Sequence, residues 1–500
     1  MKSGAFCFLR VFSSARKIIK PARSEYKSSM KKISFIFLIV LVFSAVCLGG
    51  CTGGGNPIEN ALANSFVTIE AKVENGSVFC KTTVNFYNCS ENEIKSIPFA
   101  IYSQTNANGD VRGAEILDVS QNGNKLKYRI SEGKASLKPT SDSACTAYAL
   151  ETELDESVYP NERAELVIQS VAPFGRSADG QGGEKTEVFL SRFYPVLLSL
   201  GENGFYEFCQ SEICDALFSE VAFITLKLEV SGEYSVLCGG ECTRTEVGEK
   251  TTVYTYKLDN FTEVCVLLSK GCEVFSEEKN GVRYTCFYDR NTDYADLLND
   301  LQAYVEFFSE KTKCIPFKSL AFAITGETEQ ICSFPRFVLA PKEQNTGDEN
   351  GDTARQLFKA AGEQWFKYAA RFSVSDYPCL TGGIIKTYEY SYLSHLNPAK
   401  ATAVRQTDLA EFCAFYGANA DFTDANLYLK PLSGCASLKE LSAGECGLAA
   451  LTDQAVSAAG ESKFDTAVAK FFAKRAYCIS IPQEIINYLT EVFPQAESLF

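Results

Sequence analysis

The chain has 500 residues, of which 46% are hydrophobic and 22% are charged, and its formal net charge is −14 at pH 7. Nine of the 48 Lys and Arg residues but only one of the 62 Asp and Glu residues lie among the first 50, which leaves a net charge of −22 for the rest. A body this acidic argues against nucleic acid as a partner, because binding to phosphates needs Lys and Arg side chains. It also argues against lying flat on anionic lipid.

A signal for export lies near the N-terminus. Lys31 and Lys32 form a short basic segment, an apolar run follows over residues 33–48, and small residues come just before Cys51. This order is typical of a lipoprotein signal peptide, whose cleavage leaves a cysteine that carries a lipid. The apolar run is too short and wrongly flanked for a comfortable spanning helix. The alternative is an uncleaved single span that ends at a chance cysteine.

This signal divides the N-terminal part of the chain into three predicted segments. A signal peptide should begin at its basic residues, and Met30 stands directly before the basic pair, so residues 1–29 are predicted to be an upstream extension from a misplaced gene start. Residues 30–50 form the signal peptide, and residues 51–61 form a flexible, glycine-rich tether. We therefore expect a lipid on Cys51 to hold the body on the extracytoplasmic face of the cell membrane.

Cysteine is abundant, with 20 residues in the chain and 17 of them beyond Cys51. An oxidising exterior favours disulfides. The number is odd, however, and many cysteines stand where core residues are expected, as Cys286 does in a strand-like run, so we predict buried free thiols. Cys238 and Cys242 are spaced like one of the two cysteine pairs that bind a metal ion. No second close pair completes such a site, so a hairpin turn is the preferred interpretation.

Histidine occurs once, as His395. A single histidine excludes every zinc site that uses two histidines. It also excludes most histidine-based hydrolase triads, unless His395 serves alone. The residues around His395 form no catalytic pattern, and a surface or capping role is the preferred interpretation.

Alternating apolar and polar residues over residues 62–274 predict an antiparallel β-sandwich domain. The first two strands flank an Asn75-Gly76 turn, which is typical of a β-hairpin. The predicted strands include Phe66–Val73, Val78–Tyr87, Ala164–Val171, Ala222–Val230, Thr251–Leu258 and Val264–Leu268.

The periodicity changes near residue 275, and residues 275–500 are predicted to be mostly helical. Apolar residues at helical spacing, from Leu297 to Phe308, mark the first helix. The predicted strands are Arg283–Tyr288, Ser319–Ile324 and Phe337–Ala340, and the later helices are Thr353–Phe372, Gly447–Ala459, Lys463–Ala476 and Pro482–Phe493.

Four segments carry a resemblance to known sequences. They are Arg192-Phe193-Tyr194-Pro195-Val196-Leu197, Glu363-Gln364-Trp365-Phe366, Glu445-Cys446-Gly447 and residues 462–493. In this order they resemble the WYPVL stretch, the end of the HEIAHQWF helix, the YEKGA segment and the final helices of the membrane alanyl aminopeptidases, a family of gluzincin metallopeptidases. The resemblance covers nearly the whole mature chain. It implies a multidomain protein, with an N-terminal β-sandwich followed by a thermolysin-like, mostly helical domain.

That family uses two histidines and a glutamate as zinc ligands and a second glutamate as general base. Counted from Trp365, the resemblance assigns its functional positions to residues that lack this chemistry. The zinc-ligand positions fall on Lys359, Glu363 and Gly382, the base on Ala360, the glutamate that binds the substrate amine on Ser333, and the oxyanion tyrosine on Gly444. We therefore expect a vestigial cleft without a metal or other cofactor.

Lys359 and Glu363 lie one helical turn apart, so they are predicted to pair with each other in place of the metal. The alternative is that both are solvated groups in an abandoned cleft. A remodelled cation site would have to combine Glu363 with Asp376, Glu389 or a cysteine, and the positive charge of Lys359 opposes it.

The sequence thus predicts a membrane-anchored pseudoenzyme, which has an aminopeptidase-like scaffold and binds a peptide or protein in the old cleft or has a structural role. The alternative enzyme is a metallopeptidase with a remodelled metal site. A decayed gene product is the third hypothesis.

Overall fold

The computed structural model describes residues 65–105, 111–132, 134–135, 147–173, 186–206, 209–210, 217–288, 295–342, 352–421, 424, 427 and 429–492. Contacts divide the chain into two units, Met1–Gly55 and Asn56–Phe500, and the second unit contains all of these residues. The predicted upstream extension, signal peptide, lipid-carrying Cys51 and tether lie outside the described residues.

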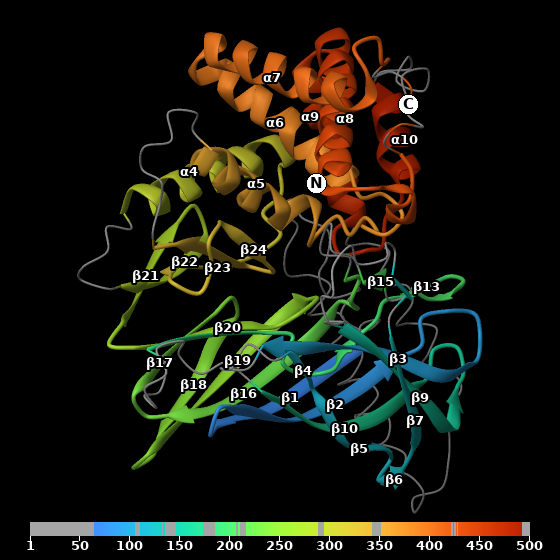
Figure 1. Ribbon diagram of the computed structural model, residues 1–500, viewed down its shortest axis with the longest axis vertical. Coiled ribbons are helices and arrows are strands. Elements are labelled where there is room, and N and C mark those ends of the chain that lie inside the picture. The colour runs from blue at the N-terminus through green and yellow to red at the C-terminus, as the bar shows by residue number, and fades with distance from the viewer. Residues whose placement is uncertain are drawn as a thin grey trace, which may run out of the picture. The chain divides into compact units, whose positions relative to one another are not determined.

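The first half of the second unit is rich in β-strands (Figure 1). Eight of the described strands form one sheet, here called the large sheet. The β1–β2 hairpin turns at Asn75 and Gly76, whose φ angles of 53° and 75° are those that such turns need. In sheet order the strands are β18 (Glu241–Val247), β19 (Thr251–Phe261), β16 (Ala222–Ser231), β1 (Ser65–Glu74), β2 (Ser77–Tyr87), β10 (Arg163–Pro173), β5 (Glu115–Gln121) and β6 (Asn124–Lys125).

A second sheet faces the large sheet across one hydrophobic core. Alternate residues of the strands point into this core, as Val67, Ile69 and Ala71 of β1 do. The prediction of strands in this region is confirmed, but the predicted antiparallel arrangement needs a correction, because β1 and β16 pair in parallel. The second sheet contains β12 (Val196–Leu197), β3 (Ile94–Thr105), β9 (Ala147–Val158) and β7 (Lys127–Glu132), with β4 (Val111–Gly113) beside β3.

Smaller pieces of sheet complete the strand-rich half. A small sheet joins three described strands in the order β11 (Glu187–Ser191), β20 (Cys265–Lys270) and β17 (Tyr234–Cys238). Short pairs form between β13 (Leu200–Gly201) and β14 (Gly204–Phe205), and between β15 (Cys209–Gln210) and β8 (Lys134–Ala135).

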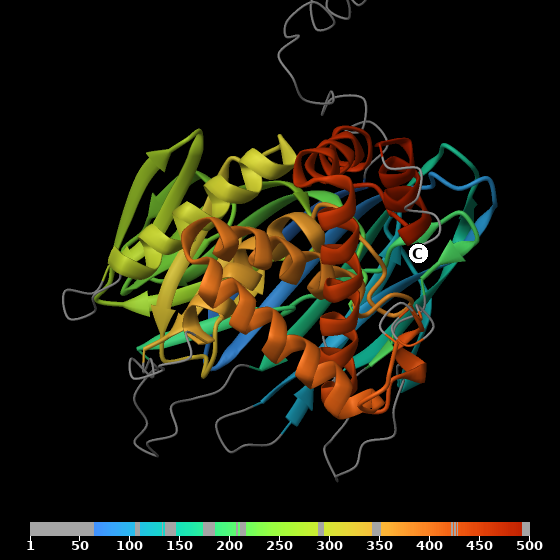
Figure 2. The same ribbon diagram turned by 90° about the horizontal axis from the view of Figure 1, so that it is seen from above.

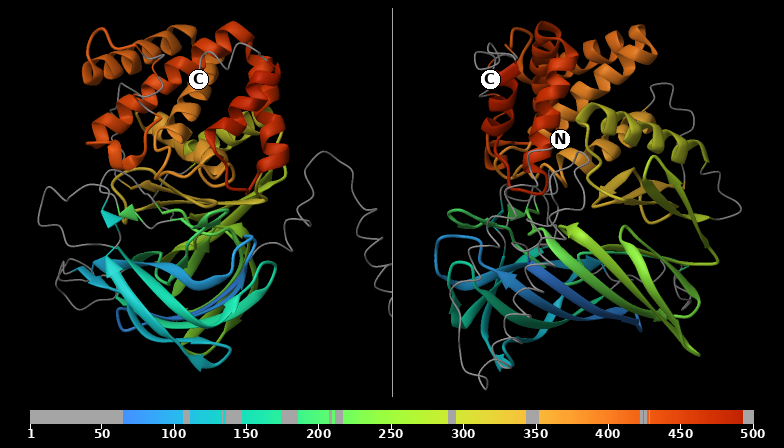
Figure 3. Two further views of the ribbon diagram at one scale, coloured as in Figure 1. Left: turned by 90° about the vertical axis from the view of Figure 1, so that its right-hand side faces the viewer. Right: turned by 180° about the vertical axis from the view of Figure 1, so that it is seen from behind.

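A mixed sheet follows in the sequence, and its central strands are buried on both faces. Leu320 and Phe322 of β23 point into the core beneath the helices, whereas Ala321 and Ala323 pack on the side of the small sheet. Figure 3 shows this sheet between the helices and the strand-rich half. Its order is β21 (Glu273–Lys279), β22 (Val282–Tyr288), β23 (Ser319–Thr325), β25 (Phe337–Pro341) and β24 (Cys332–Phe334), so β24 lies at one edge.

The first helices of the C-terminal half lie over the mixed sheet and the later ones pack against them, and Figure 2 looks down onto all of them. The apolar stripe from Leu297 to Phe308 is buried, as predicted. The helices are α4 (Ala295–Thr312), α5 (Asp352–Phe366), α6 (Leu380–Leu396), α7 (Pro398–Tyr416), α8 (Leu438–Ala459), α9 (Glu461–Arg475) and α10 (Pro482–Val492), with a short 3-10 turn, η3, at Leu432–Gly434. In the part of the chain that the structure describes, no helix is long and apolar enough to cross a membrane.

One buried arginine joins the two halves. Arg371 is 4% exposed, and its guanidinium donates hydrogen bonds to the Ser199 hydroxyl at 2.5 Å and the Ser219 carbonyl at 2.8 Å. The nearby Glu220 carboxylate accepts a hydrogen bond from the Leu200 amide at 3.0 Å. The buried guanidinium therefore has acceptors from the strand-rich half, as a buried charge requires.

Fourteen cysteines in the described ranges are free thiols, and seven of these fourteen are buried, in agreement with the prediction. The predicted hairpin between Cys238 and Cys242 is wrong. β17 ends at Cys238 and pairs with β20, whereas β18 begins at Glu241 and pairs with β19. The turn instead carries the chain from one sheet to another, and it passes so close to the mixed sheet that a Cβ at Gly239 would lie 2.6 Å from the Arg336 carbonyl oxygen.

Candidate ligand-binding site

Helix α5 presents three charged side chains on one face. Arg355, Lys359 and Glu363 are spaced four residues apart, which places them along one side of a helix. Trp365 anchors the opposite side, since it is fully buried and its indole N–H donates a 2.9 Å hydrogen bond to the Cys314 carbonyl. The packing of Trp365 therefore fixes the direction in which the charged face points.

The partner of Lys359 comes from another helix. Its ammonium lies 3.4 Å from each carboxylate oxygen of Glu445 on α8. Glu445 raises the pKa of Lys359 above its ordinary value, although burial acts in the opposite direction. The expected pairing of Lys359 with Glu363 therefore needs a correction, because Glu363 acts on Lys359 only as a nearby charge.

Gly382 on α6 makes room for this ion pair. A Cβ at residue 382 would lie 2.1 Å from the carboxylate carbon of Glu445 and 2.1 Å from one of its oxygens. Atoms cannot approach so closely, so any side chain at this position would displace the carboxylate. The Glu445 carboxylate thus occupies the space in front of Gly382 and links α8 to α5 through Lys359.

Ser333 on the edge strand β24 lies against the same helix. Its hydroxyl donates to the Ala360 carbonyl at 3.3 Å and accepts from the Gln364 amide at 2.9 Å. The Ser333 carbonyl accepts a 2.6 Å hydrogen bond from the hydroxyl of Tyr368, and Gln364 also donates to the Phe334 carbonyl. The hydroxyl and carbonyl oxygens of β24 at this edge therefore already accept hydrogen bonds from side chains of α5 and of the residues just after it.

Arg355 is the centre of a second, deeper set of charges. Its guanidinium makes a bidentate ion pair with Glu389 at 2.7 and 3.0 Å and contacts both oxygens of Asp408, the nearer at 2.9 Å. Asp408 is 1% exposed and also accepts a 2.9 Å hydrogen bond from Tyr390, while Lys386 lies 3.5 Å away. These contacts satisfy a buried carboxylate that would otherwise be costly.

One group of potential metal ligands exists within the described ranges. Asp408, Glu411 and Cys446 place one ligand atom each within 4.8 Å of one another. Asp408, however, is already occupied by Arg355 and Lys386, and these positive charges oppose a cation. Burial also raises the pKa of the Cys446 thiol to about 12, which disfavours the thiolate that a metal needs.

The residues at the centre of the site do not fit a zinc ion either. Zinc takes imidazole, thiolate or carboxylate ligands. Here the Glu445 carboxylate has the Lys359 ammonium on one side and Gly382, which has no side chain, on the other. His395 is in the last turn of α6, where its ring is 62% exposed and its Nδ1 lies 2.8 Å from the Ser391 carbonyl, in agreement with the predicted surface role. Glu363, Asp376 and Glu389 form no metal-binding group among the residues described here.

The structure brings the six predicted cleft positions onto neighbouring elements. Lys359, Ala360 and Glu363 lie on α5; the others are Ser333 on β24, Gly382 on α6 and Gly444 on α8, the residue before Glu445. The roles of Arg355, Lys386 and Asp408 were not predicted from the sequence. The four-residue spacing of Arg355 from Lys359 was the available signal, but nothing in the sequence pointed to Asp408 on α7.

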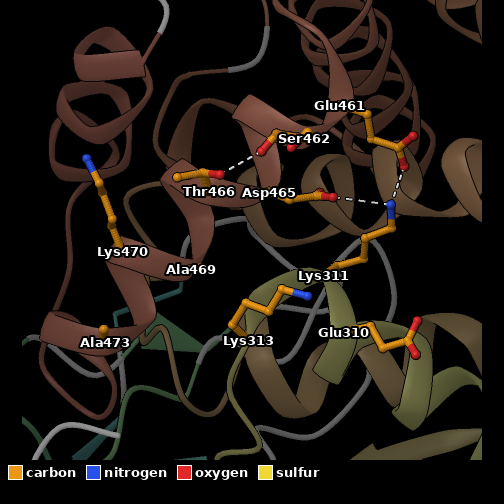
Figure 4. Close-up of a pocket in the computed structure, with 10 residues that line it drawn as sticks. All are labelled: Glu310, Lys311, Lys313, Glu461, Ser462, Asp465, Thr466, Ala469, Lys470 and Ala473. Atoms are coloured by element: carbon orange, nitrogen blue, oxygen red, sulfur yellow. Dashed lines mark hydrogen bonds and ion pairs between the residues drawn. The ribbon is translucent and has the colours of Figure 1, made fainter. Parts of the chain in front are cut away.

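A separate cavity of about 590 Å³ opens between α4 and α9 (Figure 4). Lys311 points toward Glu461 and Asp465, and its ammonium lies 3.2 Å from the Asp465 carboxylate. The cavity is lined by three lysines and three acidic residues, so its charges balance. Its lining contains none of the six predicted cleft positions.

Comparison with solved structures defines the fold class. The chain is similar to the M1 zinc metallopeptidase from Deinococcus radiodurans, with 13% identity, a TM-score of 0.59, and coverage of 87% of this chain and 93% of that one. A mutant of that enzyme bound to a Tyr-Ser-Ala substrate gives 12% identity and the same score and coverage. A two-domain M1 zinc metallopeptidase mutant bound to L-arginine matches with 13% identity and a TM-score of 0.59.

At this level of identity the likeness concerns the fold. The chain has an M1 aminopeptidase-like two-domain fold, in which a β-rich region precedes a helical one. No model of a known protein family matches the sequence, and no curated protein matches it.

Proposed function

We propose that this chain is a non-catalytic, lipid-anchored protein that uses an M1 aminopeptidase-like scaffold to bind a peptide or protein outside the membrane. The observation that carries the proposal is the Lys359–Glu445 ion pair in front of Gly382. On the sequence resemblance, Lys359 and Gly382 stand where these enzymes have zinc ligands. An ammonium and a glycine supply no ligand atom for zinc.

The proposal assigns the helical region to a thermolysin-like domain, with α5 and α6 as the helices that would hold the metal. The general base would stand at Ala360, whose methyl group takes no proton. The amine-binding position would be Ser333, which has no negative charge to attract a substrate ammonium. The chain thus lacks the groups for hydrolysis, while the scaffold around them is retained.

Metal content and activity test this proposal directly. The full chain, purified in detergent, should contain no stoichiometric zinc and should not hydrolyse aminoacyl-anilides, with or without added zinc. A matched variant, Glu363→Gln, controls for traces of contaminating peptidase. Stoichiometric zinc together with hydrolysis that is lost in this variant would sink the proposal.

The competing function is a metallopeptidase with a remodelled site. The group formed by Asp408, Glu411 and Cys446 favours it, and the positive charges of Arg355 and Lys386 oppose it. A remodelled site would bind a metal in the wild type and lose it in Cys446→Ser. The non-catalytic proposal expects the same low metal content in both proteins.

The anchor has its own test. If Cys51 carries diacylglycerol, cells that express the full chain should incorporate a labelled fatty acid into it and retain it in the membrane fraction. The Cys51→Ser variant should lose the label, whereas Cys47→Ser, a cysteine in the apolar run, should keep it. Membrane retention of Cys51→Ser without label would instead support the uncleaved span.

A further inference from the structure

The Lys359–Glu445 ion pair is asymmetric toward solvent. The Lys359 side chain keeps 48% of its accessible surface, whereas the Glu445 side chain keeps only 10%. The pair thus presents its positive member to solvent and hides its negative member. An ammonium with three N–H donors and one partner at 3.4 Å retains capacity for another acceptor.

A second cation lies close to this pair but is hidden from solvent. Lys386 on α6 has its own ion pair with Asp408 at 3.5 Å, and its side chain is only 18% exposed. Lys359 is therefore the ammonium group that solvent reaches. Glu363 is a further nearby acid, one turn along α5, but the ion pair of Lys359 within the described residues is with Glu445.

The polar groups beside Lys359 are already used. The Ser333 hydroxyl and the side chain of Gln364 satisfy each other, and the Ser333 carbonyl accepts from Tyr368. A peptide that pairs with the edge of β24 would have to break these hydrogen bonds. The ammonium of Lys359 can bind an anionic partner without breaking any of these hydrogen bonds.

We infer that Lys359 binds a carboxylate group of the peptide ligand, supplied by the C-terminus or by an acidic side chain. The inference rests on the proposed binding function and names the chemistry that would select the ligand. A site that holds a peptide's free amino terminus with a glutamate prefers a positively charged group. The residue that faces the ligand here is a cation, so the inference predicts a preference for a negatively charged group.

Titrations of the full chain in detergent, followed by saturation-transfer NMR, test the inference. The probes are N-acetyl-trialanine as the free acid, its C-terminal amide, and the same amide with a central aspartate. The free acid or the aspartate peptide should bind about fivefold more tightly than the neutral amide, which is the upper range for a half-exposed ion pair. Which of the two gains affinity identifies the source of the carboxylate.

Matched variants locate the effect. The preference should disappear in Lys359→Gln, and it should persist in Lys359→Arg and in Lys470→Gln, which removes an exposed lysine on α9. Thermal unfolding of each variant checks that it is folded. The preference should also shrink as salt is added.

Three results would overturn the inference. Equal binding of the three probes would overturn it and leave the proposed binding function standing. A preference that survives in Lys359→Gln would place the carboxylate elsewhere. Absence of saturable binding by every probe would overturn the inference and remove support from peptide binding, whereas only the zinc and hydrolysis measurements decide whether the protein is an enzyme.

Discussion

Gly382 and Glu445 compete for the same volume, since a Cβ on the glycine would lie 2.1 Å from the carboxylate carbon of the glutamate. Gly382→Ala should therefore destabilise the protein by about 1–3 kcal/mol, because the carboxylate must leave its position beside Lys359. In a Glu445→Ala background these closest contacts are gone, and the same substitution should cost far less.

Chemical denaturation of the wild type, both single variants and the double variant measures this coupling. A coupling energy near zero would mean that the Glu445 side chain moves aside freely. Gly434→Ala, where a Cβ meets only a lysine side chain at 3.7 Å, is the control for adding a methyl group to a glycine.

Arg355 is predicted to be the most sensitive residue of the charged set. Removal of its guanidinium leaves Glu389 and Asp408 buried with fewer partners, so Arg355→Met should cost about 3–5 kcal/mol in the free energy of unfolding. Arg129→Met removes an exposed pair with Glu151 and should change stability by about 0.5 kcal/mol or less. Equal losses in the two variants would contradict a special role for Arg355.

Glu440 should give stability that depends on acid pH. Burial disfavours its charged form, but hydrogen bonds from Lys430 and from the Ala436 amide outweigh this and lower its pKa below the ordinary 4.5. Its stabilising contribution is thus present above pH 4.5 and is lost as the pH falls through the lower, folded-state pKa. Glu440→Gln should cost about 1 kcal/mol near neutral pH and progressively less in acid.

Denaturation curves of Glu440→Gln and wild type at several pH values follow this difference. The control is Glu115→Gln, at an exposed position of β5. A gap between Glu440→Gln and wild type that stays constant down to strongly acid pH would show that the charge of Glu440 has no part in it.

The thiols should differ sharply in their reactivity. Cys242 is exposed, whereas Cys238 is buried and its pKa is raised to about 12, so the two should label at very different rates. Cys242→Ser should remove one rapidly labelled thiol from the native protein, and Cys238→Ala, four residues away, should leave the fast phase unchanged. Mass spectrometry of the labelled peptides identifies the sites, and rapid labelling of Cys238 would contradict its burial.

The sequence was informative where local physics decides the structure. The Asn75-Gly76 turn and the stripe from Leu297 to Phe308 depend on neighbouring residues, and both are as predicted. The sequence spacing favours an ion pair between Lys359 and Glu363, which lies one helical turn away. The ion pair that Lys359 forms is with Glu445, 86 positions further along the chain. Such a choice depends on how α5, α6 and α8 pack, which no local pattern contains.

The missed residues have the same explanation. Asp408 becomes important only because α7 brings it beside Arg355, and the parallel pairing of β1 with β16 joins segments more than a hundred residues apart. The turn at Gly239 was misjudged because two closely spaced strands usually pair with each other, whereas here they enter different sheets.

The buried hydrogen bonds of Arg371 to Ser199 and Ser219 have a consequence for cooperativity. Separation of the two halves would break these hydrogen bonds and the contact of the Arg371 guanidinium with the Phe218 ring, so neither half has its full stability alone. Heat should therefore melt the strand-rich and helical halves in a single calorimetric transition, and a cut between them should weaken both.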